Sequence, residues 1–288
     1  MGSAAEVGYR VIVAAVLHCV VIAGLGGEAE FEQRFSGWAQ TLENTMRSAG
    51  PDVKAHVLQG KSVSKDAIRT AFDSVRAAAK PEDSIAVFLI GHGSYDGVDY
   101  KFNIPGPDIT DSDLAVMLGR VPALKQLIVN MTSASGAALD SLGAPNRVVI
   151  SATKSGNEKN APVFPRYMVD ALRDAGADTD KNEVITAGEA FRYAETKTKQ
   201  FYETQKRIAT EHPMMSGGDA RFVLLRIGSV QAVAQQPEKR ALLDKREELE
   251  RKIDDLKLRK AAMPVQQYRQ ELQTLLLELA RTQQELDK

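Results

Sequence analysis

The sequence predicts a three-layer α/β domain, in which helices cover both faces of a mainly parallel sheet, followed by an α-helical hairpin. Two patterns carry this prediction. Short apolar runs alternate with amphipathic segments from Cys19 to Ile227, and heptad-like apolar residues follow after Gly228. We expect strands at 19–23, 54–58, 84–90, 126–130, 147–152 and 221–227. We expect helices at 29–48, 64–79, 111–118, 165–175 and 187–209.

Capping and turn residues bound several of these helices. Ser64 and Asp111 stand where a side chain can cap the first turn of a helix, and Pro51 and Pro81 follow predicted helix ends. The expected organisation is a degenerate signal or anchor segment at 1–18, the α/β domain at 19–228, a linker at 229–237 and the hairpin at 238–288.

An apolar run near the start of the chain has two interpretations. Val11 to Leu25 follows Arg10 and is interrupted by His18, which gives it the length and charge order of a signal-peptide core. It is shorter than the roughly 20 residues of a transmembrane helix. Its second half, from Cys19, instead fits the first buried strand. Export to the periplasm, a membrane tether and a cytoplasmic location therefore all stay open.

The composition is that of an ordinary globular protein able to bury a sizeable core, with 43% hydrophobic and 26% charged residues. A formal net charge of -1 gives no overall electrostatic footprint for nucleic acid, so we expect no nucleic-acid partner. Cys19 is the single cysteine, which excludes an intrachain disulfide and a thiolate metal cluster. Because Cys19 lies in an apolar run, we expect a buried, unreactive thiol.

Two series of residues, spaced by alternating steps of four and three, predict a coiled-coil seam in the hairpin. The first series consists of Leu242, Arg246, Leu249, Ile253 and Leu256. The second consists of Val265, Tyr268, Leu272, Leu275, Leu279, Thr282 and Leu286. Pro264 separates them, since proline cannot continue one helix but suits the first turn of the next. A two-helix hairpin buries one seam, so 238–288 either caps the main domain or pairs with another copy or a partner protein.

Two loops that directly follow predicted strands carry residues able to do chemistry. His92 stands between two glycines after the strand at 84–90, which lets the backbone turn sharply and leaves the imidazole and the Gly93 N–H open to a ligand. Ser133 begins a Ser-Ala-Ser-Gly turn after the strand at 126–130, where backbone N–H groups can stabilise an oxyanion. Ligands of open α/β sheets bind at this carboxyl edge, so the two loops predict one site.

The order and spacing of these motifs resemble the caspase-like cysteine peptidases, especially the legumain-like group and its bacterial relatives. In that family the histidine of a His-Gly pair and the cysteine of a Cys-x-Ser-Gly motif form the catalytic dyad. His92 and Gly93 match the first motif, and Ser135 and Gly136 match the end of the second. Ser133 stands where the cysteine is expected. The similarity covers roughly 20–227 and leaves the hairpin outside.

The resemblance implies a peptidase domain that takes a peptide or protein as substrate or ligand. His92 would act as base or acid, Ser133 as the residual nucleophile and the Gly93 N–H as an oxyanion donor. A thiol is partly ionised at neutral pH, whereas a serine hydroxyl needs a base to remove its proton as it attacks, so we expect impaired catalysis. The alternatives are a working serine hydrolase, an engineered inactive variant, and a non-catalytic peptide-binding or scaffolding protein that assembles through the hairpin.

The segment 178–189 has the spacing of a calcium-binding EF-hand loop. The expected ligands are Asp178, Asp180, Asn182, the Val184 carbonyl, Thr186 and Glu189. Glu183 occupies the sixth position, where the tight turn favours glycine. The sequence thus predicts Ca²⁺ as a cofactor. The alternative is a helix-entry loop whose acidic residues complement the dipole of the helix that follows.

Overall fold

The computed structural model describes residues 15–288, which form two compact units. One unit comprises 16–232 and the other contains 233–288. Of the segment 1–18 that the sequence marks as a signal or anchor, residues 1–14 lie outside the described part, whereas Leu17 and His18 belong to the first strand. Among the described residues, no helix is both long enough and apolar enough to cross a bilayer.

A sheet with the strand order β10-β8-β7-β3-β1-β2 forms the centre of the first unit. From β8 to β2 neighbouring strands run parallel, and β10 runs antiparallel to β8. Parallel strands covered on both faces carry near-continuous apolar runs, and most of the strands of this sheet were recognisable in the sequence by such runs. The strands are β1 (Leu17–Ala23), β2 (Val53–Leu58), β3 (Ser84–Ile90), β7 (Lys125–Asn130), β8 (Arg147–Ser151) and β10 (Met214–Ser216).

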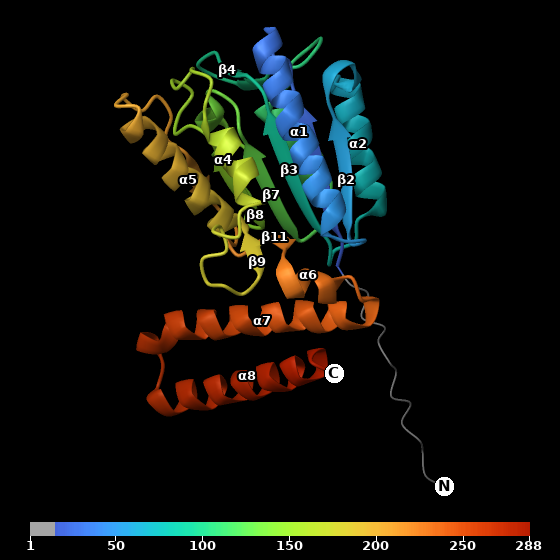
Figure 1. Ribbon diagram of the computed structural model, residues 1–288, viewed down its shortest axis with the longest axis vertical. Helices are drawn as coiled ribbons and strands as arrows, with labels where there is room; N and C mark the ends of the chain where they lie inside the picture. The colour runs from blue at the N-terminus through green and yellow to red at the C-terminus, as the bar shows by residue number, and fades with distance from the viewer. Residues whose placement is uncertain (1–14) are drawn as a thin grey trace. The chain divides into compact units, whose positions relative to one another are not determined.

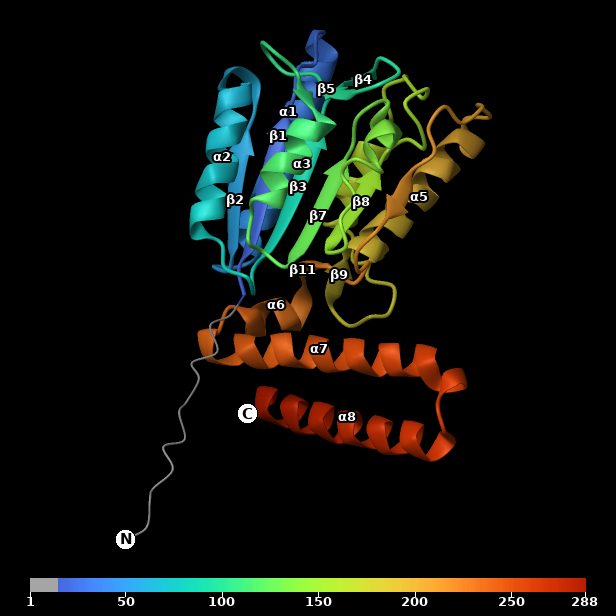
Figure 2. The ribbon, with the colours of Figure 1, turned by 180° about the vertical axis from the view of Figure 1, so that it is seen from behind.

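Side chains of these strands alternate between two cores, one on each face of the sheet. In β1, Cys19 and Val21 belong to one core, and Val20 and Ile22 belong to the other. Three helices cover the first face (Figure 1) and two cover the second (Figure 2). The first three are α1 (Ala29–Ala49), α4 (Phe164–Ala171) and α5 (Ala187–Thr204), and the other two are α2 (Lys65–Ala78) and α3 (Asp111–Gly119). The predicted three-layer α/β fold with a mainly parallel sheet is confirmed.

Two small antiparallel sheets complete the unit as described. One follows β3 and consists of β4 (Gly93–Tyr95), β5 (Tyr100–Phe102) and β6 (Ile109–Thr110). The other pairs β9 (Val184–Thr186) with β11 (Val223–Arg226). The strand expected at 221–227 therefore exists, but it lies outside the main sheet. The sixth strand of the main sheet is instead β10, whose three residues are too few to show a pattern in the sequence.

Of the two helix caps predicted from the sequence, one is formed by the predicted residue and the other by its neighbour. The Ser64 hydroxyl accepts the Ala67 N–H at 3.1 Å and caps α2, as predicted. The cap of α3 is Thr110, so the prediction of Asp111 was wrong by one residue. Thr110 caps the helix because its hydroxyl accepts the Asp113 N–H while the Asp113 carboxylate accepts the Thr110 N–H. This reciprocal pair of bonds is a capping box.

The second unit contains the predicted hairpin, formed by α7 (Pro237–Arg259) and α8 (Val265–Leu286) with a short 3₁₀ turn, η3 (Lys260–Ala262), between them. An ion pair of 2.8 Å joins Lys245 of α7 to Glu278 of α8. Two details of the predicted seam were wrong: Leu243 is buried and Leu242 only half-buried, and Val265 is 65% exposed. A further helix, α6 (Gly228–Ala234), occupies much of the segment expected to be a linker.

Candidate functional site

The turns after β3 and β7 meet at the carboxyl edge of the sheet, because these two strands are parallel neighbours. The Ser133 hydroxyl accepts the Gly93 N–H at 3.1 Å and donates to the Gly93 carbonyl at 2.9 Å. Residue 93 has to be glycine for this approach, since a Cβ there would lie 2.5 Å from the Ser133 carbonyl oxygen. The structure thus brings Gly93 and Ser133 into direct contact, and the Ser133 hydroxyl both accepts from and donates to the Gly93 backbone.

His92 is held from another direction. Its Nε2 lies 3.2 Å from the carbonyl oxygen of Gly26, in the loop after β1. Its ring packs edge-on against Phe31 and Phe35 of α1, with centroid distances of 4.8 Å and 5.2 Å. Within residues 15–288, His92 forms no hydrogen bond with Ser133 and none with a carboxylate. A serine-protease type of relay, with an acid behind the imidazole and the serine in front of it, is not assembled here.

The backbone donors of the serine turn are also engaged. Ala134 takes a left-handed conformation with φ 54° and donates its N–H to the Glu158 carbonyl at 2.8 Å. The Gly136 N–H donates to the Thr153 hydroxyl at 2.8 Å. The segment that follows is the short 3₁₀ helix η2 (Ser135–Ala138). The N–H groups of Gly93, Ala134 and Gly136 are therefore bonded within the protein, and the last two bond to the loop that follows β8.

A buried polar network lies directly beneath the turn. The Tyr100 hydroxyl is 3.1 Å from Asn130 Oδ1 and 2.7 Å from the Thr132 hydroxyl, and Thr132 also bonds Asn130 at 2.8 Å. Burial raises the pKa of the Tyr100 phenol, so this group stays neutral. Sequence reasoning did not single out these residues. The signal was present, since Asn130 and Thr132 are polar residues at the end of an apolar strand.

Cys19 is fully buried in the core beneath α1. Burial raises the pKa of its thiol to about 12, which leaves the thiol protonated and unreactive at neutral pH. The single cysteine of the sequence is therefore a buried core residue, as the sequence predicted.

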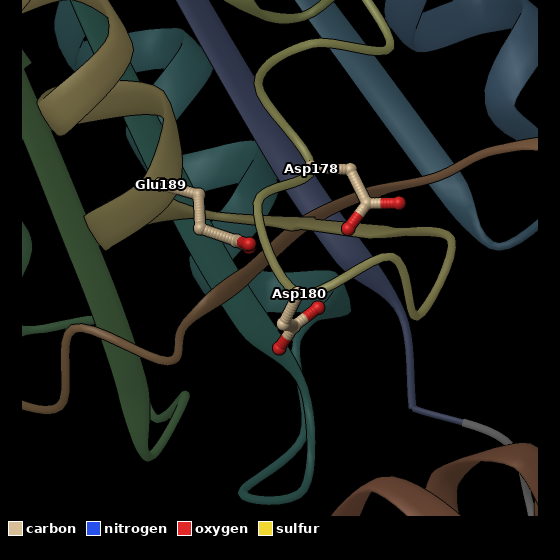
Figure 3. A group of neighbouring side chains, drawn as sticks. All are labelled: Asp178, Asp180 and Glu189. Atoms are coloured by element: carbon tan, nitrogen blue, oxygen red, sulfur yellow. The ribbon is translucent and has the colours of Figure 1, made fainter.

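The loop at 178–189 brings three carboxylates together (Figure 3). One oxygen from each of Asp178, Asp180 and Glu189 lies within 4.8 Å of the others. Glu183 adopts a left-handed conformation with φ 63°. The tight turn that favours glycine at this position therefore forms with a glutamate in its place. The Glu183 carboxylate accepts the Ser229 hydroxyl at 2.5 Å and the Val230 N–H at 2.9 Å in the first turn of α6. Its side chain thus has a structural role that glycine could not fill.

The other predicted ligands of this loop bond within it. Asn182 donates its amide to Asp180 at 3.1 Å and accepts the Val184 N–H at 2.8 Å. Thr186 caps α5 and donates its hydroxyl to Glu189 at 2.8 Å. The Val184 carbonyl belongs to strand β9, which pairs with β11. The carboxylates therefore converge, while the Asn182 and Thr186 side chains are turned to their neighbours.

The charges of these carboxylates influence one another. Burial raises the pKa of Asp180, the Asn182 N–H lowers it, and the neighbouring charges of Glu189 and Asp178 raise it further, so the net shift is upward. Burial also raises the pKa of Glu189, but hydrogen bonds from Thr186 and Thr179 outweigh it and the net shift is downward. Three close carboxylates of this kind are the donor set that a hard cation such as Ca²⁺ prefers.

Fold and site together define a three-layer α/β protein with a His-Gly turn and a serine turn at the carboxyl edge of its sheet. No family model and no curated protein matches the sequence. Among solved structures, the protein GSU0716 from Geobacter sulfurreducens aligns with a TM-score of 0.49 and 12% identity, covering 74% of this chain and 97% of that one. The Drosophila initiator caspase Dronc aligns with a TM-score of 0.49 and 11% identity, covering 73% and 82%.

A third structure, Raptor from Chaetomium thermophilum, aligns with a TM-score of 0.42 and 10% identity, covering 59% of this chain and 19% of that one. The similar structures thus include a caspase. They give no support to the legumain-like part of that prediction. At these identities the comparisons concern the fold and say nothing about activity.

Proposed function

We propose that the unit at 16–232 is a peptidase-type domain with a disarmed nucleophile, which binds peptides but hydrolyses them poorly. The observation that carries the proposal is the pair of hydrogen bonds between the Ser133 hydroxyl and the Gly93 backbone. They direct the serine proton to a carbonyl instead of to His92, and they occupy the N–H that would stabilise an oxyanion. The motif order His-Gly and x-x-Ser-x-Ser-Gly supports the peptidase-type assignment.

A cleavage assay on a pool of fluorogenic peptides tests the proposal with a set of variants at the two positions. We expect the unaltered protein to be no faster than Ser133→Ala. We expect Ser133→Cys to be at least about 100-fold faster, because a thiol ionises without the general base that the serine lacks and His92 can then protonate the leaving group. Adding His92→Ala to Ser133→Cys should remove this gain.

Two results would contradict the proposal. Turnover by the unaltered protein that Ser133→Ala abolishes would identify a working serine hydrolase. No cleavage by Ser133→Cys, with its circular-dichroism spectrum unchanged, would argue against the peptidase-type assignment and favour a purely non-catalytic binding protein.

We also propose that the loop at 178–189 binds Ca²⁺ as a structural cation. The convergence of Asp178, Asp180 and Glu189 supports this, together with the left-handed backbone of Glu183 at the position where such loops turn. When bound, the ion would offset the mutual repulsion of the three carboxylates, and the Asn182 and Thr186 side chains would have to turn from their neighbours in the loop to supply neutral ligands.

Calorimetric titration with calcium chloride tests this second proposal. We expect a dissociation constant on the order of 0.1–1 mM, as in weak extracellular modules, and an affinity at least about tenfold lower for Glu189→Gln. Glu195→Gln on an exposed turn of α5 is the matched control and should bind like the unaltered protein. The absence of binding heat at millimolar calcium would remove the metal and leave the loop as a helix-entry segment.

A further inference from the structure

Tyr100, Asn130 and Thr132 bring a phenol, an amide and a hydroxyl together beneath the serine turn, and all three side chains are fully buried. Tyr100 comes from β5, Asn130 ends β7 and Thr132 directly precedes Ser133. A phenol loses its hydrogen bonds to water when it is buried, and this loss costs free energy. Phenylalanine would fill the same space without that cost, so the Tyr100 hydroxyl itself has a role to fill.

The two hydroxyl protons of this cluster serve two further acceptors, Asn130 Oδ1 and the Ser133 carbonyl oxygen. The Tyr100 hydroxyl lies 3.1 Å from Asn130 Oδ1 and 2.7 Å from the Thr132 hydroxyl. The Thr132 hydroxyl lies 2.8 Å from Asn130 Oδ1 and 3.0 Å from the Ser133 carbonyl oxygen. When Tyr100 donates to Asn130, the Thr132 proton is free to hold the Ser133 carbonyl. The phenol thus acts on Ser133 through Thr132.

The same groups surround Gly93, whose backbone the Ser133 hydroxyl binds. A Cβ at position 93 would lie 2.5 Å from the Thr132 hydroxyl oxygen, 2.5 Å from the Ser133 carbonyl oxygen and 2.7 Å from the Tyr100 ring. These three groups therefore form one wall against Gly93. Because the wall includes the Ser133 carbonyl, a shift of that carbonyl moves the Ser133 side chain relative to the Gly93 N–H, which lies 3.1 Å from its hydroxyl.

We propose that Tyr100 is a positioning residue for the nucleophile position: through Thr132 its hydroxyl holds the Ser133 carbonyl and aligns the side chain with the Gly93 N–H. This rests on the proposed function, which makes position 133 the nucleophile position. Without the phenol hydroxyl, Thr132 is the remaining donor to Asn130 Oδ1 in the part of the chain that the structure describes. With one proton for two acceptors, the shorter contact favours Asn130, and the Ser133 carbonyl loses its donor.

The pH dependence of alkylation of the Ser133→Cys protein tests this proposal. A thiol at this position would accept the Gly93 N–H in place of the hydroxyl, and that hydrogen bond favours the thiolate. Iodoacetamide reacts with the thiolate, so the midpoint of the labelling rate against pH reports the pKa of the thiol. Adding Tyr100→Phe should raise this midpoint by at least about 0.5 pH unit, because the N–H bond is weakened. Cys19 is buried and does not compete for the label.

The linking hydroxyl provides a second variant. Thr132→Val should raise the midpoint by the same amount as Tyr100→Phe. The two substitutions together should add nothing further, because both act on the same carbonyl. Tyr95→Phe is the matched control. Tyr95 pairs with Tyr100 across β4 and β5, but its hydroxyl donates to the Gly97 carbonyl at 2.9 Å, so the midpoint should not change.

Alkylation needs no peptide cleavage, so its result is separate from that of the cleavage assay. A midpoint that Tyr100→Phe leaves unchanged, a shift that Tyr95→Phe reproduces, or full additivity of Tyr100→Phe and Thr132→Val would overturn the positioning role. The expected shifts in a Ser133→Cys protein that cleaves no peptide would contradict the proposed function and leave the positioning role in place.

Discussion

Gly136→Ala is expected to lower the free energy of unfolding by about 3 kcal/mol, because the added methyl group has no space. A Cβ at this position would overlap backbone atoms of Lys154 and Ser155 and lie 2.6 Å from the Thr153 carbonyl oxygen. These are main-chain atoms and cannot rotate away as a side chain would. The serine turn and the loop after β8 would have to separate, which would also break the hydrogen bond from Gly136 to Thr153.

Urea unfolding followed by circular dichroism measures this loss, with Gly37→Ala as the matched control. Gly37 is exposed in the middle of α1, and a Cβ there would meet nothing within 4 Å. Alanine is the better helix former, so the control should gain up to about 1 kcal/mol. Equal effects of the two substitutions would mean that the turn can move without cost, and the close contact would then have no bearing on the site.

The parts of the fold that the sequence predicted are those in which one local pattern decides the structure. The strands β1, β3, β7 and β8 each contain an uninterrupted run of three to six apolar residues, so each stands out as a buried parallel strand. The residues of β10 lack such a pattern and gain their structure from pairing with β8, more than sixty residues earlier in the chain. The position of β11 likewise depends on β9, which no local pattern of three residues can reveal.

The candidate site also has a part that the sequence predicted and a part that it did not. The neighbourhood of Gly93 and Ser133 follows from the order of parallel strands and was predictable, because both residues come directly after strands that pair. The direction of the Ser133 proton was not predictable. It depends on a contact with the Gly93 backbone forty residues away, and the left-handed Ala134 is held by the Glu158 carbonyl. Such contacts are set by loops whose course only tertiary packing determines.

Glu211→Ala is expected to cost about 4 kcal/mol, since it leaves two buried donors and one half-buried donor without their acceptor. The Glu211 side chain is buried, and its carboxylate accepts the N–H groups of Val163 and Phe164 at 2.7 Å and 3.0 Å. It also accepts the Tyr202 hydroxyl at 2.9 Å. These bonds tie the segment before β10 to the start of α4. Urea unfolding measures the loss, and Glu203→Ala, an exposed residue of α5, should change stability by less than about 0.5 kcal/mol.

The same carboxylate should make stability depend on pH in a direction that identifies it. Burial raises the pKa of Glu211, the hydrogen bonds from Val163, Phe164 and Tyr202 lower it, and the nearby charge of Glu158 raises it, so the net shift is upward from 4.5. The folded state then binds more protons than the unfolded state, and the contribution of Glu211 to stability falls as pH rises from about 4.5 through the raised pKa. The side chain of the Glu211→Gln variant does not titrate. Compared with this variant, the unaltered protein should therefore lose free energy of unfolding as pH rises over that interval. A difference that stays constant between pH 4 and pH 8 would show that the hydrogen bonds fully offset the burial of the charge.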